Sequence, residues 1–249
     1  MAKIFPLSEG VFTVGRDKQF IPFDLNNDEL TDRSTGSLLV EVQPFLVVTD
    51  KDLIVFDAGL GFSGKDGIMQ IHANIAQAGY SYEQVTKVLL SHLHKDHTGG
   101  VLQKDANGLL KPTFPNAEYY VYRPEADYAL KTGYPSYHPE EIEALLSVAK
   151  IHWLDGEQGM IDGYIQYTHS GGHCPEHIVY LVDDGEDKVF YGGDEAPQLK
   201  QMKMKYIAKY DFDGKKAMAL REQYGEAGRR EGWKFLFYHD VTTPVAVLN

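Results

Sequence analysis

The chain has 249 residues and a formal net charge of −12 at pH 7, with 43% hydrophobic and 24% charged residues. This composition is ordinary for a folded globular protein, and the length suits one α/β domain, which we expect over residues 1–249. The acidic excess disfavours nucleic acid as a partner, because binding to phosphates depends on clustered Lys and Arg.

Cysteine content and hydropathy indicate the compartment in which the protein functions. Cys174 is the single cysteine, so no intramolecular disulfide can form, which fits a reducing compartment. The first ten residues lack the apolar core of a secretory signal, and no stretch approaches the ~20 apolar residues of a membrane-spanning helix. We therefore expect a cytoplasmic protein with no membrane partner.

The first 60 residues have mainly strand-like patterns. Expected strands lie at 11–14, 38–48 and 53–56, and we interpret the polar segment 16–34 as a surface loop. The run Ile54–Phe56 is continuously apolar, which predicts a strand buried on both faces. It ends at Asp57, followed by Gly59, at a strand end where α/β folds tend to place functional groups.

Helices and strands alternate along the rest of the chain. We expect helices at 68–78, 124–131, 140–150 and 214–230, and strands at 85–90, 118–122, 151–154, 164–168, 178–182, 189–191 and 234–238. The Met-, Lys- and Tyr-rich segment 200–210 is interpreted as an amphipathic helix. Strands in runs in each half, with helices between and after them, predict two sheets with outer helices.

A dense group of metal-ligand residue types follows the strand expected at 85–90. It comprises His92, His94, Asp96 and His97, four potential ligands within six positions. In an extended segment, residues two apart project to the same side, so His92 and His94 can reach one point. A turn after them aims Asp96 and His97 elsewhere, so one segment can serve two neighbouring metals. The alternative, a solvated polar loop, is disfavoured by this density.

Three more candidate ligands stand at the ends of strand-like runs. His173 lies in a turn marked by glycines and Pro175, Asp194 follows two glycines, and His239 follows an apolar run. Taken alone, His173 is equally well interpreted as a turn histidine, because Gly and Pro mark turns of every kind. Asp194 alone is better interpreted as a turn aspartate, and the alternative for His239 is a core or edge histidine. A carboxylate such as Asp194 can place one oxygen on each of two metals.

The segment His92-Leu93-His94-Lys95-Asp96-His97 resembles the HxHxDH motif of the metallo-β-lactamase superfamily. Other residues of that family's pattern occur in the expected order. Asp57 and Gly59 lie upstream of the motif, and His173, Asp194 and His239 lie downstream. The resemblance spans about residues 38–240 and is specific, since separate marks agree. It implies an α/β fold, a four-layer αββα sandwich of two mixed sheets flanked by helices, with a dinuclear metal site at one edge.

The resemblance also implies roles for the individual residues. The first metal would be held by His92, His94 and His173, the second by Asp96, His97 and His239, with Asp194 bridging them. Asp57 would orient a ligand, and His177 would have a supporting role at most. The implied cofactors are two divalent metal ions, with zinc favoured and manganese or iron as alternatives.

The resemblance implies that the protein hydrolyses a small-molecule ester, lactone or thioester. The nucleophile would be a hydroxide that bridges the metals, and Asp96 and Asp194 would be the catalytic carboxylates. The segment Gly79–Val85, which leads to the motif, resembles the corresponding segment in the lactonase and organophosphate-hydrolase branches. Many lactonases carry a tyrosine three residues after the bridging aspartate, where this chain has Pro197. The candidate replacements are Tyr191, Tyr206 and Tyr210.

Other branches of the family fit less well. The main β-lactamases have a cysteine where Asp194 stands, and flavodiiron proteins have a carboxylate where His94 stands. A mononuclear iron dioxygenase of the same fold and a phosphotriester hydrolase stay open, whereas the complete ligand set disfavours a non-catalytic binding module. The segments 16–34 and 200–210 are alternatively substrate walls, and a homodimer is left open.

Overall fold

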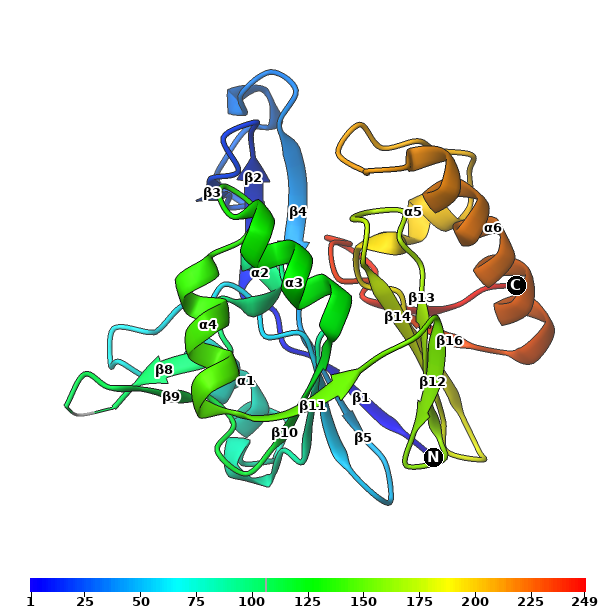
Figure 1. Cartoon of the computed structure of the whole chain (residues 1–249). Helices are drawn as coiled ribbons and strands as arrows, with labels where there is room; N and C mark the ends of the chain where they lie inside the picture. The colour runs from blue at the N-terminus through cyan, green and yellow to red at the C-terminus, as the bar shows by residue number, and fades with distance from the viewer. Residues whose placement is uncertain (106) are drawn as a thin grey trace.

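The computed structural model describes residues 1–105 and 107–249. Two six-stranded sheets face each other, with helices on their outer sides (Figure 1). The first sheet has the order β1-β5-β6-β7-β10-β11, with strands Lys3–Pro6, Phe45–Val48, Leu53–Phe56, Lys87–Leu89, Glu118–Tyr122 and Lys150–Leu154. The second has the order β12-β13-β14-β15-β16-β17, with strands Gln158–Ile161, Ile165–His169, Ile178–Asp183, Lys188–Tyr191, Lys234–Leu236 and Val245–Val247.

Both main sheets are mixed. The pairs β6–β7, β7–β10 and β10–β11 are parallel in the first sheet and β15–β16 is parallel in the second, while the remaining pairs are antiparallel. A three-stranded antiparallel sheet adjoins them in the order β3-β2-β4, formed by Phe20–Pro22, Gly10–Val14 and Leu38–Val42. A two-stranded sheet pairs β8, Leu102–Lys104, with β9, Leu110–Pro112.

Helices cover the outer face of each main sheet, so the predicted αββα sandwich is confirmed (Figure 1). On the first sheet these are α1, α3 and α4, which span Gln70–Gln77, Arg123–Thr132 and Pro139–Val148. On the second sheet it is α6, Gly214–Glu231. The remaining helical pieces are short, namely α2 (Lys95–Thr98), α5 (Leu199–Met202) and the 3₁₀ turns Leu30–Asp32, Tyr82–Gln84 and Gly193–Glu195.

Strand β6 shows how the layers share one segment. Ile54 and Phe56 pack between the two sheets, whereas Val55 packs on the opposite face with the residues of α1, α3 and α4. All three side chains are fully buried, as the continuous apolar run predicted. The strand therefore ends in the middle of the sandwich, and Asp57 emerges between the layers.

Three sequence predictions about segments were wrong. Residues 38–48 form two strands, β4 and β5, in different sheets, because Pro44 cannot donate to a strand ladder. The segment 16–34 contains β3 and a 3₁₀ turn rather than only a loop. The helix expected at 200–210 ends at Met202, and turns follow it.

The other expected helices and strands are present, with ends shifted by a few residues. Short strands at the sheet edges, such as β1 and β17, were missed because their apolar runs are brief. Among the described residues, no helix combines the length and the apolarity needed to cross a bilayer.

Candidate metal centre

The histidine cluster is presented where β7 meets α2. Strand β7 ends at Leu89, the chain continues to His94 without regular secondary structure, and α2 then turns Asp96 and His97 inward. The loop after β6 is tied to this segment, because Ala58 N–H donates to the carbonyl of His97 at 2.8 Å. A Cβ on Gly100 would lie 2.0 Å from the Ala58 carbonyl oxygen, so this close approach requires glycine.

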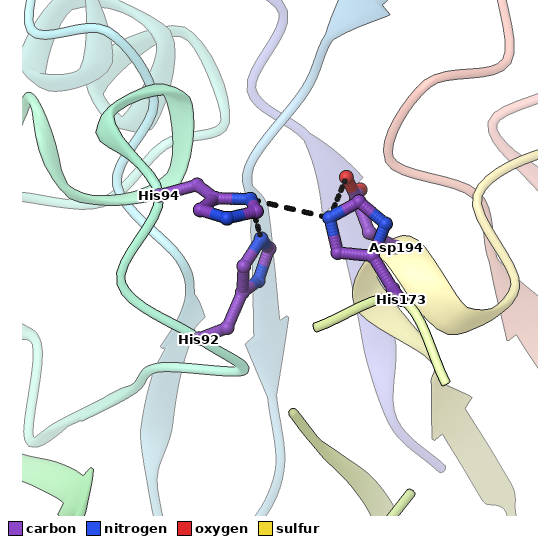
Figure 2. Close-up of side chains that lie close together, drawn as sticks. All are labelled: His92, His94, His173 and Asp194. Atoms are coloured by element: carbon purple, nitrogen blue, oxygen red, sulfur yellow. Dashed lines mark hydrogen bonds and ion pairs between the residues drawn. The ribbon is translucent and has the colours of Figure 1, made fainter. Parts of the chain in front are cut away.

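The first group of donors combines two histidines from this loop with residues of the second sheet's end. Figure 2 shows the side chains of His92 and His94 facing those of His173 and Asp194. His94 Nδ1 lies 2.9 Å from His92 Nε2 and 3.2 Å from His173 Nε2. Asp194 Oδ2 lies 3.2 Å from His173 Nε2. These four side chains could hold one metal ion.

The second group consists of Asp96, His97 and His239. Asp96 Oδ2 lies 3.6 Å from His97 Nε2 and 3.5 Å from His239 Nε2. The other oxygen of Asp194, Oδ1, lies 3.3 Å from His97 Nε2 and 3.0 Å from His239 Nε2. Asp194 thus directs one oxygen toward each group, which is the arrangement expected of a bridging carboxylate.

Four histidines are oriented through the ring nitrogen that faces away from the centre. His97 Nδ1 lies 2.6 Å from Asp57 Oδ2, and His239 Nδ1 lies 2.7 Å from the Glu41 carbonyl oxygen. His173 Nδ1 lies 3.2 Å from Asp211 Oδ1, and His92 Nδ1 lies 3.0 Å from Ser91 Oγ. Such contacts fix each ring and leave Nε2 for a metal ion.

Asp57 and His177 touch the proposed ligands from behind. Besides His97, Asp57 accepts hydrogen bonds from Ser91 N–H at 2.8 Å and from the Tyr191 hydroxyl at 2.5 Å. His177 Nε2 accepts the backbone N–H of Asp194 at 3.2 Å. His177 therefore supports the carboxylate that faces both groups and does not itself belong to either group.

Burial lowers the pKa of each of these rings, and the neighbouring charges decide the net shift. Burial lowers the pKa of His92 and His94 well below the ordinary range. At His97 and His239, burial also lowers the pKa, but the combined effect of the neighbouring carboxylates, led by Asp194, outweighs burial, so both pKa values are raised. Burial raises the pKa of Asp194, but the histidines facing it outweigh burial and hold that pKa well below its usual range.

The donor set fits divalent cations. His97 Nε2 and Asp194 Oδ1 are buried and have no hydrogen-bond partner, which is costly unless a ligand satisfies them. Imidazole nitrogens and carboxylate oxygens are the usual ligands of zinc and similar metals. The structure thus brings all seven sequence-predicted ligands together, in two groups that share Asp194.

Several supporting residues gave no signal in the sequence. Glu195 accepts the N–H groups of Gly172 and His173, at 3.0 and 3.3 Å. The buried Arg221 of α6 donates to the carbonyls of Glu195 and Tyr206, at 3.1 and 2.6 Å. Arg221 thus connects the turn that carries Asp194 with a segment of the cavity wall.

Glu125 and Glu9 are two further buried carboxylates that sequence reasoning missed. Glu125 accepts the N–H of Leu93 at 2.9 Å and lies 3.7 Å from Cys174 Sγ, so it links the loop of His92 to the turn of His173. Burial raises its pKa to about 7. Glu9 accepts the N–H of Gly61 at 3.1 Å and holds the loop that follows Asp57. Neither glutamate belongs to a recognisable motif.

A cavity of about 160 Å³ opens onto the two groups. One wall is apolar and comes from the three-stranded sheet, with Val14, Phe20, Leu38, Leu39 and Val40. The other wall carries Gln198, Gln201, Tyr206 and Tyr210, and the lining also includes Lys18, Lys95 and Ser136. Parts of segments 16–34 and 200–210 therefore line the cavity, as the alternative interpretation held.

The tyrosine candidates separate by position. Tyr206 and Tyr210 line the cavity, whereas Tyr191 is fully buried and donates to Asp57, so Tyr191 is not available to a substrate. Pro197 contributes its carbonyl, which accepts the N–H of His239 at 3.0 Å. It therefore helps to position a proposed ligand.

Comparison with known families agrees with this geometry. The profile of the metallo-beta-lactamase superfamily matches residues 39–239, which contain both donor groups. The chain belongs to the metallo-beta-lactamase superfamily. The family expected from the His92–His97 motif is thus confirmed, and hydrolases are its relatives in both sequence and structure.

Sequence relatives include an N-acyl homoserine lactonase from Bacillus sp., 25% identical over 169 residues, which cover 67% of this chain and 60% of the lactonase. An atrochrysone carboxyl ACP thioesterase from Passalora fulva is 22% identical over 151 residues, which cover 60% of this chain and 36% of that enzyme. The chain thus spans less than two thirds of the length of each of these relatives.

Solved structures share the whole fold. A probable metal-dependent hydrolase from Staphylococcus aureus superposes with a TM-score of 0.77 at 19% identity, covering 98% of this chain and 91% of that one. AidC, a dizinc quorum-quenching lactonase, gives a TM-score of 0.73 at 19% identity, covering 99% and 90% of the two chains. At these identities the likeness shows the metallo-beta-lactamase fold.

Proposed function

We propose that this metallo-beta-lactamase superfamily protein hydrolyses a small-molecule ester, lactone or thioester with two divalent metal ions, of which zinc is favoured. The observation that carries the proposal is the pair of donor groups that share Asp194, one oxygen of which lies near each group. A lactone is the favoured substrate, since the sequence relatives include homoserine lactonases, and a thioester is next, since they include thioesterases.

Two divalent cations held here would supply the nucleophile, because they lower the pKa of a water from near 15.7 to about 7, and they would polarise the substrate carbonyl. The chain contributes positioning. Asp57, Asp211 and the Glu41 carbonyl fix three of the rings, so the donors need little reorganisation during the reaction.

Asp96 and Asp194 are the proposed catalytic carboxylates. Both line the cavity, and Asp96 directs Oδ2 at the second group, so its other oxygen can orient a water or pass a proton to the leaving group. This role needs no covalent intermediate. Cys174 is buried and burial raises its pKa, which fits a structural residue rather than a nucleophile.

Tyr210 is the proposed replacement for the lactonase tyrosine. Its hydroxyl accepts a hydrogen bond from Gln201 Nε2 at 3.2 Å, and its ring lies 5.9 Å from that of His173. Its own proton is therefore free to donate to a substrate carbonyl oxygen. We expect Tyr210→Phe to lower kcat about 100-fold with metal content unchanged, in line with the loss of one donor to a developing oxyanion. An unchanged kcat would assign that donor role to Tyr206 or to no tyrosine.

The decisive experiment is metal analysis followed by a substrate screen. Protein loaded with zinc or manganese should contain two metal ions per chain and hydrolyse at least one lactone, thioester or simple ester. Asp194→Ala should lose both the second metal and the activity. One iron per chain would favour the dioxygenase alternative, and turnover of phosphotriesters alone would favour the phosphotriester hydrolase. Full activity of the metal-free protein would contradict the proposal.

Two further features bear on the compartment and the substrate size proposed for the enzyme. The single buried Cys174 fits a reducing compartment, so we place the enzyme in the cytoplasm. The narrow cavity fits a small molecule rather than a polymer.

A further inference from the structure

Two lysines line the cavity that opens onto the donor groups. Apart from the proposed ligands, Lys18 and Lys95 are the only Lys, Arg, Asp or Glu side chains that line it among the described residues. Both are half-buried, and neither forms an ion pair within the part of the chain that the structure describes. A half-buried cation without a counter-charge carries a desolvation cost that an anion would offset.

Each lysine is held at the cavity by its local structure. Lys95 sits between His94 and Asp96 at the start of α2, and its Nζ lies 5.8 Å from the centre of the Phe20 ring on the apolar wall. Lys18 lies in a turn closed by its N–H donating to Gly15 at 3.1 Å. Its φ of 58° is in the left-handed region, which non-glycine residues adopt rarely and often at functional sites.

Lys18 belongs to the turn between β2 and β3 and Lys95 belongs to α2, so two separate segments bring the lysines to the cavity. The apolar wall of Val14, Phe20 and Leu38 faces the same space. The cavity therefore offers methylene contacts beside two cationic groups.

We infer that this cavity selects substrates that carry a carboxylate remote from the scissile carbonyl, and that Lys18 and Lys95 bind that carboxylate. The inference rests on the proposed hydrolase function and names its substrate class, a compact ester, lactone or thioester with a short apolar spacer and a terminal anion. The volume of about 160 Å³ favours a short spacer over a long acyl chain.

The test compares thioesters of one neutral thiol, N-acetylcysteamine, with the metal-loaded protein. The adipoyl monothioester ends in a carboxylate, the hexanoyl thioester ends in a methyl group, and the 6-aminohexanoyl thioester ends in an ammonium. We expect kcat/KM for the adipoyl compound to exceed that for the hexanoyl compound at least 10-fold. Added salt should reduce this ratio, because screening weakens partly exposed charge pairs.

Substitutions assign the preference to the two lysines. Lys18→Gln and Lys95→Gln should each reduce the adipoyl-to-hexanoyl ratio at least 5-fold, and Lys18→Glu should shift the preference toward the 6-aminohexanoyl compound. A purely structural role would not reverse the sign of the preference. Lys104→Gln, at an exposed position of β8, is the matched control and should leave the ratio unchanged. An adipoyl-to-hexanoyl ratio near one, or a ratio that none of the cavity substitutions alters, overturns the inference.

A binding measurement separates this inference from the proposed function. Adipate should raise the Tm of the metal-loaded protein more than hexanoate does, and Lys18→Glu should abolish that difference. If no thioester or lactone is hydrolysed but this difference is present, the proposed function fails and the anion site stands. If hydrolysis occurs but adipate and hexanoate stabilise the protein equally, the anion site fails and the hydrolase stands.

Discussion

At the scale of single residues, the site depends on what lies behind each imidazole. His97 faces the centre through Nε2 because Asp57 holds its Nδ1 at 2.6 Å. His94 is the exception, since it directs Nδ1 inward toward His92 and His173. Residue type alone therefore says that a ring can bind metal, and the contacts on its far side decide which nitrogen does so.

Asp57 provides the sharpest residue-scale prediction. Asp57→Ala should weaken metal binding about 10- to 100-fold, because His97 loses its orienting partner while Ser91 and Tyr191 lose their acceptor. Competition with a chelator, with zinc content read at each step, measures the change. Asp50→Ala, at an exposed turn, is the control and should bind metal normally. Normal metal affinity in Asp57→Ala would contradict the role assigned to Asp57.

At the scale of elements, α6 and the segment after α5 hold the second half of the site together. Arg221 projects from α6 and donates to the carbonyl of Glu195, which follows Asp194, and to that of Tyr206 in the cavity wall. Its Nη1 also lies 3.9 Å from Asp211, the partner of His173. One buried cation thus fixes the turn after β15 relative to the cavity wall.

Removing that cation should destabilise the fold and the site together. Arg221→Met leaves buried acceptors and the charge of Asp211 without a partner, and we expect a loss of about 3 kcal/mol in the free energy of unfolding. Denaturant unfolding of the metal-free protein measures it. Arg229→Met, at an exposed position of the same helix, should change the stability little. Equal stability of the two variants would show that Arg221 is not required to hold these segments.

The contact between the loop after β6 and the end of α2 gives a second prediction at this scale. Gly100→Ala should strongly destabilise the protein, because its Cβ would fall 2.0 Å from the Ala58 carbonyl oxygen and force the two loops apart. Gly225→Ala, inside α6 with ordinary contacts at 3.5 Å, should be neutral or stabilising by up to about 1 kcal/mol. Thermal unfolding distinguishes the two, and a Tm for Gly100→Ala near that of the unmodified protein would refute the packing argument.

At the scale of the whole molecule, the proposed ligands come from both halves of the sandwich. His92, His94, Asp96 and His97 follow the first sheet, whereas His173, Asp194 and His239 follow strands of the second. A metal ion bound by both sets would link the two layers in the folded state only. Metal binding should therefore stabilise the fold in proportion to its affinity.

Chelation is the corresponding test. Removing metal should lower the Tm by several degrees, and zinc should restore it, because a ligand at 100 times its Kd adds about 2.7 kcal/mol. His239→Ala should lose part of that gain, since it removes a donor from the second group alone. A Tm that chelation leaves unchanged would mean that the donors do not bind metal in solution.

Sequence reasoning identified the fold, the family and the seven proposed ligands because those signals are local. The His92–His97 motif lies within six residues, and the buried strands β6 and β7 show as continuous apolar runs. Pairing, cavity walls and supporting contacts are different, because they join residues far apart in the chain. Asp211, Glu195 and Arg221 belong to no motif, and their roles depend on α6 packing beside the turn that carries Asp194.

The sequence by itself determined the metal-dependent chemistry proposed for this chain, because the candidate ligand types and their spacing are contained in a few short segments. Only the tertiary structure decided how that chemistry is directed. It placed Lys18 and Phe20 in a cavity wall where the sequence indicated a loop, and it brought Tyr210 rather than Tyr191 to the centre. The physical reason is that metal ligands are recognised by type, whereas a substrate is recognised by the shape and charge of surfaces that exist only after folding.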